Sequence, residues 1–177
     1  PGRQQDAQSC LTTLYNCYIE ASNQEVSTEL LIGMATVIKG EQCECNPTHH
    51  EDDTILNVAI DDHDTLEQAI EGHFKPEVID GENRWKCDNP ICTHKGQPQK
   101  FTKLDSMTAM PSTMTLSLKR HNQKGNKNHK SITFPTAIMN PFNKAIQELT
   151  AVIVHSGRVE EGHYITYVKA TETWWKC

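Results

Sequence analysis

Two runs of sequence near the end of the chain decide the fold: LTAVIVHSG at residues 149–157 and EGHYITYVK at residues 161–169. Both runs are rich in β-branched and aromatic residues, which favour strands, and we expect strands at Leu149–Val154 and Tyr164–Val168. Serine and glycine residues stand between the two runs and are typical of a turn. The pair therefore predicts an antiparallel hairpin with a longer connection.

The rest of the chain predicts an α+β fold, with helices early and an antiparallel sheet late. Apolar residues at helical spacing indicate a helix over Gln4–Glu20 and a short helix around Leu66–Phe74. Three further segments have the composition of strands: Glu29–Lys39 with a bend at Gly33, Ile55–Ile60 and Thr113–Leu118. Two polar segments are expected to form a loop and a ribbon tip: Thr48–Asp53, and Asn83–Lys100 with short flanking strands.

The composition of the 177 residues disfavours several classes of function. The formal net charge is −6, whereas a nucleic-acid-binding surface needs clustered positive charge. No run approaches the about 20 apolar residues that cross a membrane. We therefore expect no nucleic-acid partner and no membrane partner, and an intracellular protein of the cytoplasm or the nucleus. The low apolar fraction of 36% favours exposed ribbons over one thick core.

The seven cysteines exceed what an ordinary core needs, and their odd number disfavours a framework of disulfides alone. Cys43 and Cys45 lie on one expected turn, and Cys87 and Cys92 lie on another. Four thiolates from two turns can surround one zinc ion, although these spacings are unusual, so free thiols or a disulfide remain alternatives. Three histidines offer a substitute for one of the cysteines: His49, His50 and His94.

Cys10 and Cys17 stand seven positions apart on the expected first helix, hence on one face beside Leu14. A free cysteine commonly behaves as a small buried apolar residue. We therefore expect both thiols to be packed in the core.

His163 and His155 are both candidates for catalysis by position. Gly162 precedes His163, and such a small neighbour lets another chain segment come close. Taken alone, a histidine that opens a strand is more often structural than catalytic, and His155 lies on the partner strand. The local pattern leaves the two histidines as alternatives.

The hairpin segment resembles the histidine box of the ubiquitin-specific proteases, a family in which the histidine of a Gly-His-Tyr triplet is the general base. Further segments match that family in the same order: Gln4–Gln8, the two cysteine pairs, Leu116–Arg120 and Lys130–Pro135. The resemblance implies a papain-like cysteine peptidase domain over residues 1–177 with zinc-ribbon-like fingers. It divides the chain into a thumb-helix remnant (1–28), fingers (29–62 and 78–106), a short helix (63–77) and a palm (107–177).

The resemblance also implies a function, namely thiol-dependent hydrolysis of the bond after the C-terminal glycine of ubiquitin. It makes His163 the general base and His155 a structural neighbour. Ubiquitin and ubiquitinated proteins are the implied partners, with Asp6 and Gln5 facing the basic tail of ubiquitin. Asp6 also suits the positive N-terminal end of a helix. The implied cofactor is a structural zinc ion held by four cysteines: Cys43, Cys45, Cys87 and Cys92.

The sequence departs from the family pattern at both ends. The nucleophilic cysteine of the family lies in an Asn-x-Cys box before the Gln-Gln-Asp helix, and here that helix begins at residue 4. The third catalytic residue of the family, Asp or Asn, follows a tryptophan strand, which here runs to Cys177. We therefore expect this chain by itself to be inactive, and its first helix to expose apolar surface. Two alternatives stay open: a catalytically dead ubiquitin-binding scaffold, and a zinc-ribbon interaction module unrelated to ubiquitin.

Overall fold

The computed structural model describes residues 6–23, 27–120, 126–140, 144–157 and 162–177. Their contacts group the chain into two compact units. The ribbon unit consists of Val26–Leu56 and Gly72–Thr115, and the hairpin unit consists of Pro1–Glu25, Asn57–Glu71 and Leu116–Cys177. Both units are built from antiparallel strands and few helices, as the α+β prediction requires.

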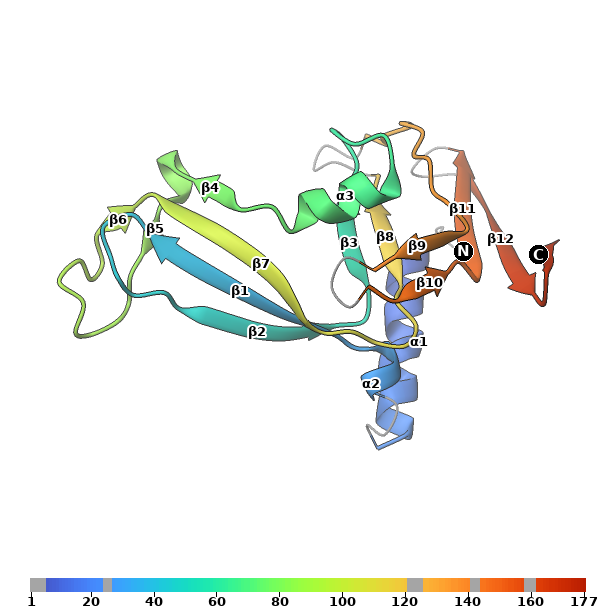
Figure 1. The fold of residues 1–177 in the computed structure, drawn as a ribbon, viewed down its shortest axis with the longest axis horizontal. Coiled ribbons are helices and arrows are strands. Elements are labelled where there is room, and N and C mark those ends of the chain that lie inside the picture. The colour runs from blue at the N-terminus through green and yellow to red at the C-terminus, as the bar shows by residue number, and fades with distance from the viewer. Residues whose placement is uncertain (1–5, 24–26, 121–125, 141–143, 158–161) are drawn as a thin grey trace, which may run out of the picture. The chain divides into compact units, whose positions relative to one another are not determined.

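The ribbon unit contains a four-stranded antiparallel sheet in the order β2-β1-β7-β4 (Figure 1). Its strands are β1 (Ile32–Gly40), β2 (Thr48–Asp53), β4 (Glu77–Ile79) and β7 (Phe101–Ala109). Shorter elements complete the unit: α2 (Ser27–Leu30), η1 (Gly81–Asn83), β5 (Trp85–Lys86) and β6 (Pro98–Gln99). The first part of β1 is the apolar core of this sheet, because Ile32, Met34 and Ala35 are buried. The expected strand over Glu29–Lys39 thus begins later, after the turn of helix α2.

The central and edge strands of this sheet differ most from the prediction. Thr48–Asp53 is strand β2 and not a loop, although all six of its residues are exposed. Charged residues are common on such an edge, because they discourage pairing with another chain. The pattern of Phe101–Ala109 predicts no element, yet this segment is β7, which pairs with both β1 and β4.

Gly33 is the point at which β1 bends, as predicted. The register between β1 and β7 shifts between Gly33 and Met34, which marks a β-bulge. A Cβ atom at Gly33 would lie 2.8 Å from the side chains of Thr108 and Ala109 on β7. Only glycine allows the two backbones to come this close.

The hairpin unit holds the longest helix and several small sheets. Its elements are α1 (Ala7–Ala21), β3 (Leu56–Ala59), β8 (Leu116–Lys119), β9 (Ala137–Met139), β10 (Ile146–Glu148), β11 (Ala151–Gly157), β12 (Gly162–Ala170) and β13 (Thr173–Lys176). Helix α3 (Leu66–His73) begins in this unit and buries Ala69 and Ile70. Val58 and Ile60, at and just after β3, are fully buried and form the centre of the core. Strands β11, β12 and β13 form one antiparallel sheet in that order, which confirms the predicted hairpin.

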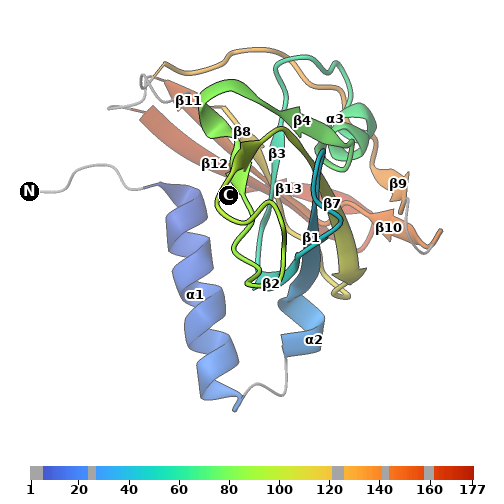
Figure 2. The ribbon, with the colours of Figure 1, turned by 90° about the vertical axis from the view of Figure 1, so that its left-hand side faces the viewer.

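Helix α1, drawn in blue in Figure 2, is more buried along one side than along the other. Ile19 is buried, whereas Leu14 and Tyr18 are 60% and 54% exposed. The prediction that Cys10 and Cys17 are packed in the core is wrong, because both thiols are exposed on the same face as Leu14. In the part of the chain that the structure describes, no helix is both long and apolar enough to span a membrane.

Candidate functional site

The four predicted metal ligands converge in the ribbon unit. Cys43 and Cys45 follow the end of β1, and Cys87 and Cys92 lie in the connection between β5 and β6. Their sulfur atoms all lie within 4.8 Å of one another, and Cys43 and Cys87 are buried. The sulfurs of Cys43 and Cys92 are 3.2 Å apart. Among the described residues this group contains no histidine, so none of the three candidate substitutes is part of it.

Local hydrogen bonds shape the two turns that present these sulfurs. The backbone N–H of Gly96 donates to the carbonyl of Cys87 at 2.8 Å, and the N–H of Cys92 donates to the carbonyl of Asn89 at 3.1 Å. The side-chain amide of Asn89 also donates to the sulfur of Cys45 at 3.3 Å. The β5–β6 ladder closes the base of this connection. The turn that carries Cys87 and Cys92 is therefore held by backbone hydrogen bonds in addition to the sulfur cluster.

Close packing perturbs the thiols in opposite directions. Burial raises the pKa of the Cys87 thiol. Burial also acts to raise the pKa of Cys43, but hydrogen bonds with Cys92 and from the backbone N–H of Cys45 outweigh it, and this pKa lies below its usual value. The hydrogen bond with Cys43 raises the pKa of Cys45 to about 12. A thiolate on one cysteine of the cluster therefore disfavours deprotonation of the neighbouring thiols. A bound cation removes this repulsion.

The geometry of the cluster fits a metal ion. Zinc–sulfur bonds of about 2.3 Å in a tetrahedron place the sulfurs about 3.8 Å apart. The observed cluster, with all sulfurs within 4.8 Å, needs only small side-chain adjustments to reach that spacing. Thiolate donors suit zinc and other soft ions. The four cysteines can therefore hold one metal ion.

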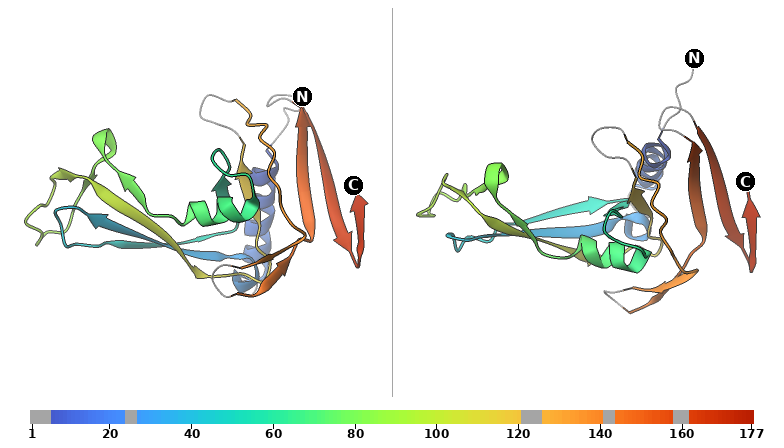
Figure 3. Two further views of the ribbon diagram at one scale, coloured as in Figure 1. Left: turned by 45° about the horizontal axis from the view of Figure 1, so that its top comes forward. Right: turned by 90° about the horizontal axis from the view of Figure 1, so that it is seen from above.

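The two histidines of the hairpin lie on opposite faces of the β11–β12 ladder. Figure 3 shows the strands of this hairpin in the orange-to-red part of the chain. His163 is paired with Ser156, and His155 is paired with Tyr164. Because side chains alternate along a strand, the paired positions share a face and neighbouring positions do not. His163 is exposed, whereas His155 is half-buried and its ring lies 4.7 Å from the ring of Tyr164, centre to centre.

Gly162 is required by the ring of His155. A Cβ atom at Gly162 would collide with the Nε2 atom of His155, and it would lie 2.6 Å from the carbonyl oxygen of Ser156. A glycine before His163 predicts that another chain segment comes close to it, and that segment is the side chain of His155. The two histidines are linked through this glycine: one fills the space beside it, and the other follows it in the chain.

Asp6 is the N-cap residue of α1. Its carboxylate accepts hydrogen bonds from the backbone N–H and the hydroxyl of Ser9, at 2.9 and 3.3 Å. The expected stabilising role at the helix start is confirmed. Gln5, the other predicted ubiquitin contact, lies outside the described residues.

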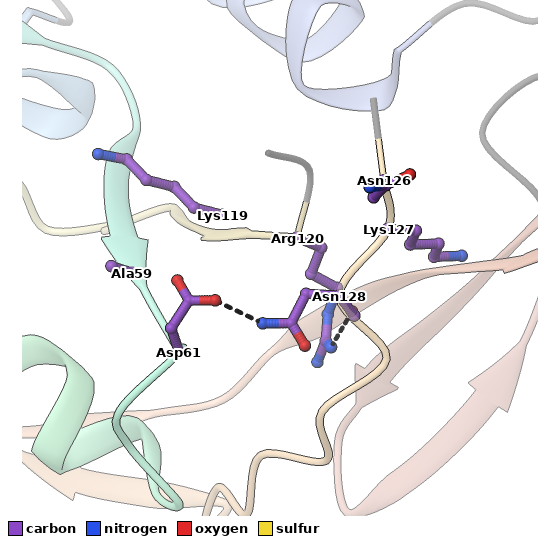
Figure 4. A pocket seen from close by; sticks show the side chains of 7 residues that line it. All are labelled: Ala59, Asp61, Lys119, Arg120, Asn126, Lys127 and Asn128. Carbon is purple, nitrogen blue, oxygen red and sulfur yellow. Dashed lines mark hydrogen bonds between the residues drawn. The ribbon is translucent and has the colours of Figure 1, made fainter. Parts of the chain in front are cut away.

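A pocket of about 480 Å³, lined mainly by charged and amide residues, lies in the hairpin unit (Figure 4). Its lining comes from the end of β3, the end of β8 and the following loop: Ala59, Asp61, Lys119, Arg120, Asn126, Lys127 and Asn128. The sequence pattern does not indicate Lys127 as a catalytic or binding residue, because a lysine in a polar segment carries no local signal of a role. It contacts the histidine hairpin directly, with its ammonium 2.9 Å from the Nδ1 atom of His155.

Solved structures share this fold. The Ubp8-containing SAGA DUB module bound to monoubiquitin matches with a TM-score of 0.78 and 25% identity, over 98% of this chain and 43% of that chain. The same module bound to ubiquitin aldehyde matches with a TM-score of 0.76 and 23% identity, over 98% of this chain and 44% of that chain. The fold is thus that of a papain-like cysteine peptidase domain, as predicted.

Sequence comparison defines the family. The model of the ubiquitin carboxyl-terminal hydrolase family matches residues 1–177. Human ubiquitin carboxyl-terminal hydrolase 17-like proteins 12 and 6 are each 32% identical over 148 residues, which is 76% of this chain and 27% and 36% of those proteins. This chain belongs to the ubiquitin carboxyl-terminal hydrolase family, and the predicted relation to ubiquitin-specific proteases is confirmed. It spans about a third or less of the length of these curated relatives.

Proposed function

We propose that this chain is the base-carrying part of a deubiquitinating cysteine peptidase that hydrolyses the bond after the C-terminal glycine of ubiquitin. The observation that carries the proposal is the environment of His163, which is exposed on its own face of the hairpin in a chain of this family. His155, by contrast, is half-buried, contacts Tyr164 and binds Lys127. This difference supports His163, rather than His155, as the general base.

In the proposed reaction, the imidazole of His163 removes the proton from a cysteine thiol. The thiolate attacks the carbonyl carbon of the C-terminal glycine of ubiquitin, and the amine leaves with a proton from the imidazolium. Water, deprotonated by the same imidazole, then hydrolyses the thioester and releases the carboxylate and the thiol. An Asp or Asn would hold the imidazole in the productive tautomer.

The attacking thiol comes from the Asn-x-Cys box that the family carries before the first helix. Four of the seven cysteines gather in the ribbon unit, where they form the metal-ligand cluster. Cys10 and Cys17 lie exposed on α1. We expect residues 1–177 by themselves to show no turnover, because a histidine without the nucleophilic thiol has no route to the thioester.

The metal in the ribbon unit is a structural zinc ion bound by Cys43, Cys45, Cys87 and Cys92. Four protein ligands leave no open coordination position for water or substrate, which is the usual arrangement of a structural site. The cluster ties the end of β1 to the β5–β6 connection, two parts of the unit that are distant in sequence. Zinc therefore stabilises the ribbon and takes no part in the chemistry.

Ubiquitin is the proposed partner of both units. The structural match to Ubp8 in a module bound to monoubiquitin supports this assignment. The net charge of −6 agrees in sign with a basic ubiquitin tail, and Asp6 offers a carboxylate at the start of α1.

Titration of fluorescently labelled ubiquitin against the 177-residue chain tests the partner without requiring catalysis. We expect saturable binding, and we expect Asp6→Asn to weaken it several-fold while retaining the N-cap and the melting temperature. Asp6→Ala should weaken binding and also cost about 1 kcal/mol of stability. A folded, zinc-loaded chain that does not bind ubiquitin would contradict the proposed partner, whereas unchanged binding by Asp6→Asn would contradict only the contact assigned to Asp6.

A further inference from the structure

We propose that Lys127 is a positioning residue that fixes the β11–β12 hairpin at His163. The inference rests on the proposed function of His163 as the general base. Residues 126–130, which follow β8, contact β11 through Lys127, close to Ser156, the residue that pairs with His163.

Lys127 uses all the donors of its ammonium group on β11. The ammonium donates to the Nδ1 atom of His155 at 2.9 Å, to the carbonyl of His155 at 3.0 Å and to the carbonyl of Gly157 at 3.1 Å. A lysine ammonium has three N–H donors and no acceptor. Each donor therefore has a partner, and all three partners belong to the last residues of one strand.

These partners lie on the open side of the sheet. Among the strands that the structure describes, β11 lies at the edge of the order β11-β12-β13 and pairs with β12. Backbone carbonyls on an open edge need a donor from water or from another segment. Lys127 supplies that donor at the end of β11 and takes the place of a neighbouring strand there.

The two carbonyls that Lys127 binds flank Ser156, which is the residue paired with His163. Gly157 is paired with Gly162, directly before His163. The third contact holds the ring of His155, which fills the space beside Gly162. The ammonium thus fixes the segment of β11 against which the backbone of His163 is aligned.

The loop that carries Lys127 is itself tied to the end of β8. The guanidinium of Arg120 donates to the carbonyls of Asn128 and Lys130, at 3.2 and 2.7 Å. The backbone N–H of Asn128 donates back to the carbonyl of Arg120 at 2.6 Å. The residue next to Lys127 is therefore held at both its N–H and its carbonyl.

A second set of bonds ties the loop to the segment after β3 (Figure 4). The side-chain amide of Asn128 donates to the carboxylate of Asp61 at 2.9 Å. The ammonium of Lys130 donates to the carbonyl of Asp61 at 3.0 Å and pairs with the carboxylate of Asp64 at 3.1 Å. Bonds from two elements fix the loop, and the loop fixes the hairpin through Lys127.

The test uses the complete peptidase, in which this chain is joined to the segment that carries the nucleophile, with a ubiquitin C-terminal fluorogenic amide. Lys127→Met removes the three donors while retaining an unbranched side chain. We expect kcat to fall roughly tenfold or more, because small displacements of a catalytic group are costly, and KM to change little. Lys127→Arg retains the charge and donors for the carbonyls, so it should recover part of kcat.

Lys169→Met is the matched control. Lys169 lies on β12 and pairs with the carboxylates of Glu148 and Glu172, at 3.2 and 3.9 Å. Its substitution therefore removes ion pairs of a hairpin strand without touching the carbonyls of β11. We expect this variant to keep the kcat of the wild type. Equal losses from Lys127→Met and Lys169→Met would overturn the inference, because the effect would then be one of general stability.

Nuclear magnetic resonance of the 177-residue chain provides a readout that is independent of turnover. We expect Lys127→Met to shift the resonances of His155 Nδ1 and of the Ser156 and His163 amides, and Lys169→Met to leave them in place. If Lys127→Met does not fold, Lys127→Arg replaces it in the kinetic assay and in the resonance measurement. For this variant we expect a smaller loss of kcat and shifts of the same resonances. The proposed function would be contradicted if the wild-type peptidase had no activity or if His163→Ala were active. The positioning role alone would be contradicted if both Lys127 variants kept full kcat while His163→Ala was inactive.

Discussion

Replacing His163 with alanine is expected to lower kcat of the complete peptidase by roughly 10⁴-fold. Without the imidazole, the nucleophilic thiol loses its general base and the leaving amine loses its proton donor. The exposed position of His163 means that the side chain contributes little to packing, so the melting temperature should stay close to that of the wild type. Hydrolysis of a ubiquitin C-terminal fluorogenic amide measures the loss.

His155→Gln is the matched variant on the partner strand. Glutamine can still offer an acceptor to Lys127, and the two backbone carbonyls that Lys127 binds remain. We expect a loss of about tenfold at most, through the position of the hairpin. Comparable losses from the two substitutions would contradict the assignment of the base to His163.

Removal of the proposed zinc ion is the second change with a large expected effect. Cys87 is only 1% exposed, and the tip around the cluster has little apolar packing of its own, since Ile91 is 88% exposed. We expect one zinc ion per chain by elemental analysis. Chelation or Cys87→Ser should then lower the melting temperature by more than about 10 °C, because a structural zinc site contributes directly to folding.

Cys17→Ser is the control for the metal site, because its thiol is exposed on α1 and lies outside the cluster. This substitution should change neither the zinc content nor the melting temperature. A protein that contains no zinc and melts at the same temperature with and without a chelator would contradict the zinc proposal, and a mass lower by two hydrogens would show a disulfide instead.

The sequence predicts the features that depend on local patterns. The hairpin is found within a few residues, with β11 at Ala151–Gly157 against an expected Leu149–Val154. The two cysteine pairs are far apart in the chain, but thiol chemistry alone favours their convergence. The bend at Gly33 is likewise found, because glycine within a strand is a local signal of a bulge.

The features that the sequence does not reveal depend on non-local packing. Strand β2 is polar throughout and is a strand only because β1 pairs with it. Cys10 and Cys17 stand on a helical face as expected, but the periodicity does not tell which of the two apolar sides of α1 is covered. The proposed role of Lys127 depends on its contact with His155, which lies 28 positions later in the chain.

We propose that this chain belongs to an enzyme that cuts after the C-terminal glycine of ubiquitin. The decisive experiment is an intact-mass measurement of ubiquitin carrying a C-terminal peptide extension, before and after incubation with the complete peptidase. We expect a product with the mass of ubiquitin ending at that glycine, together with the free peptide, and no product with His163→Ala. An uncut fusion, or a cut at any other bond, would contradict the proposed function.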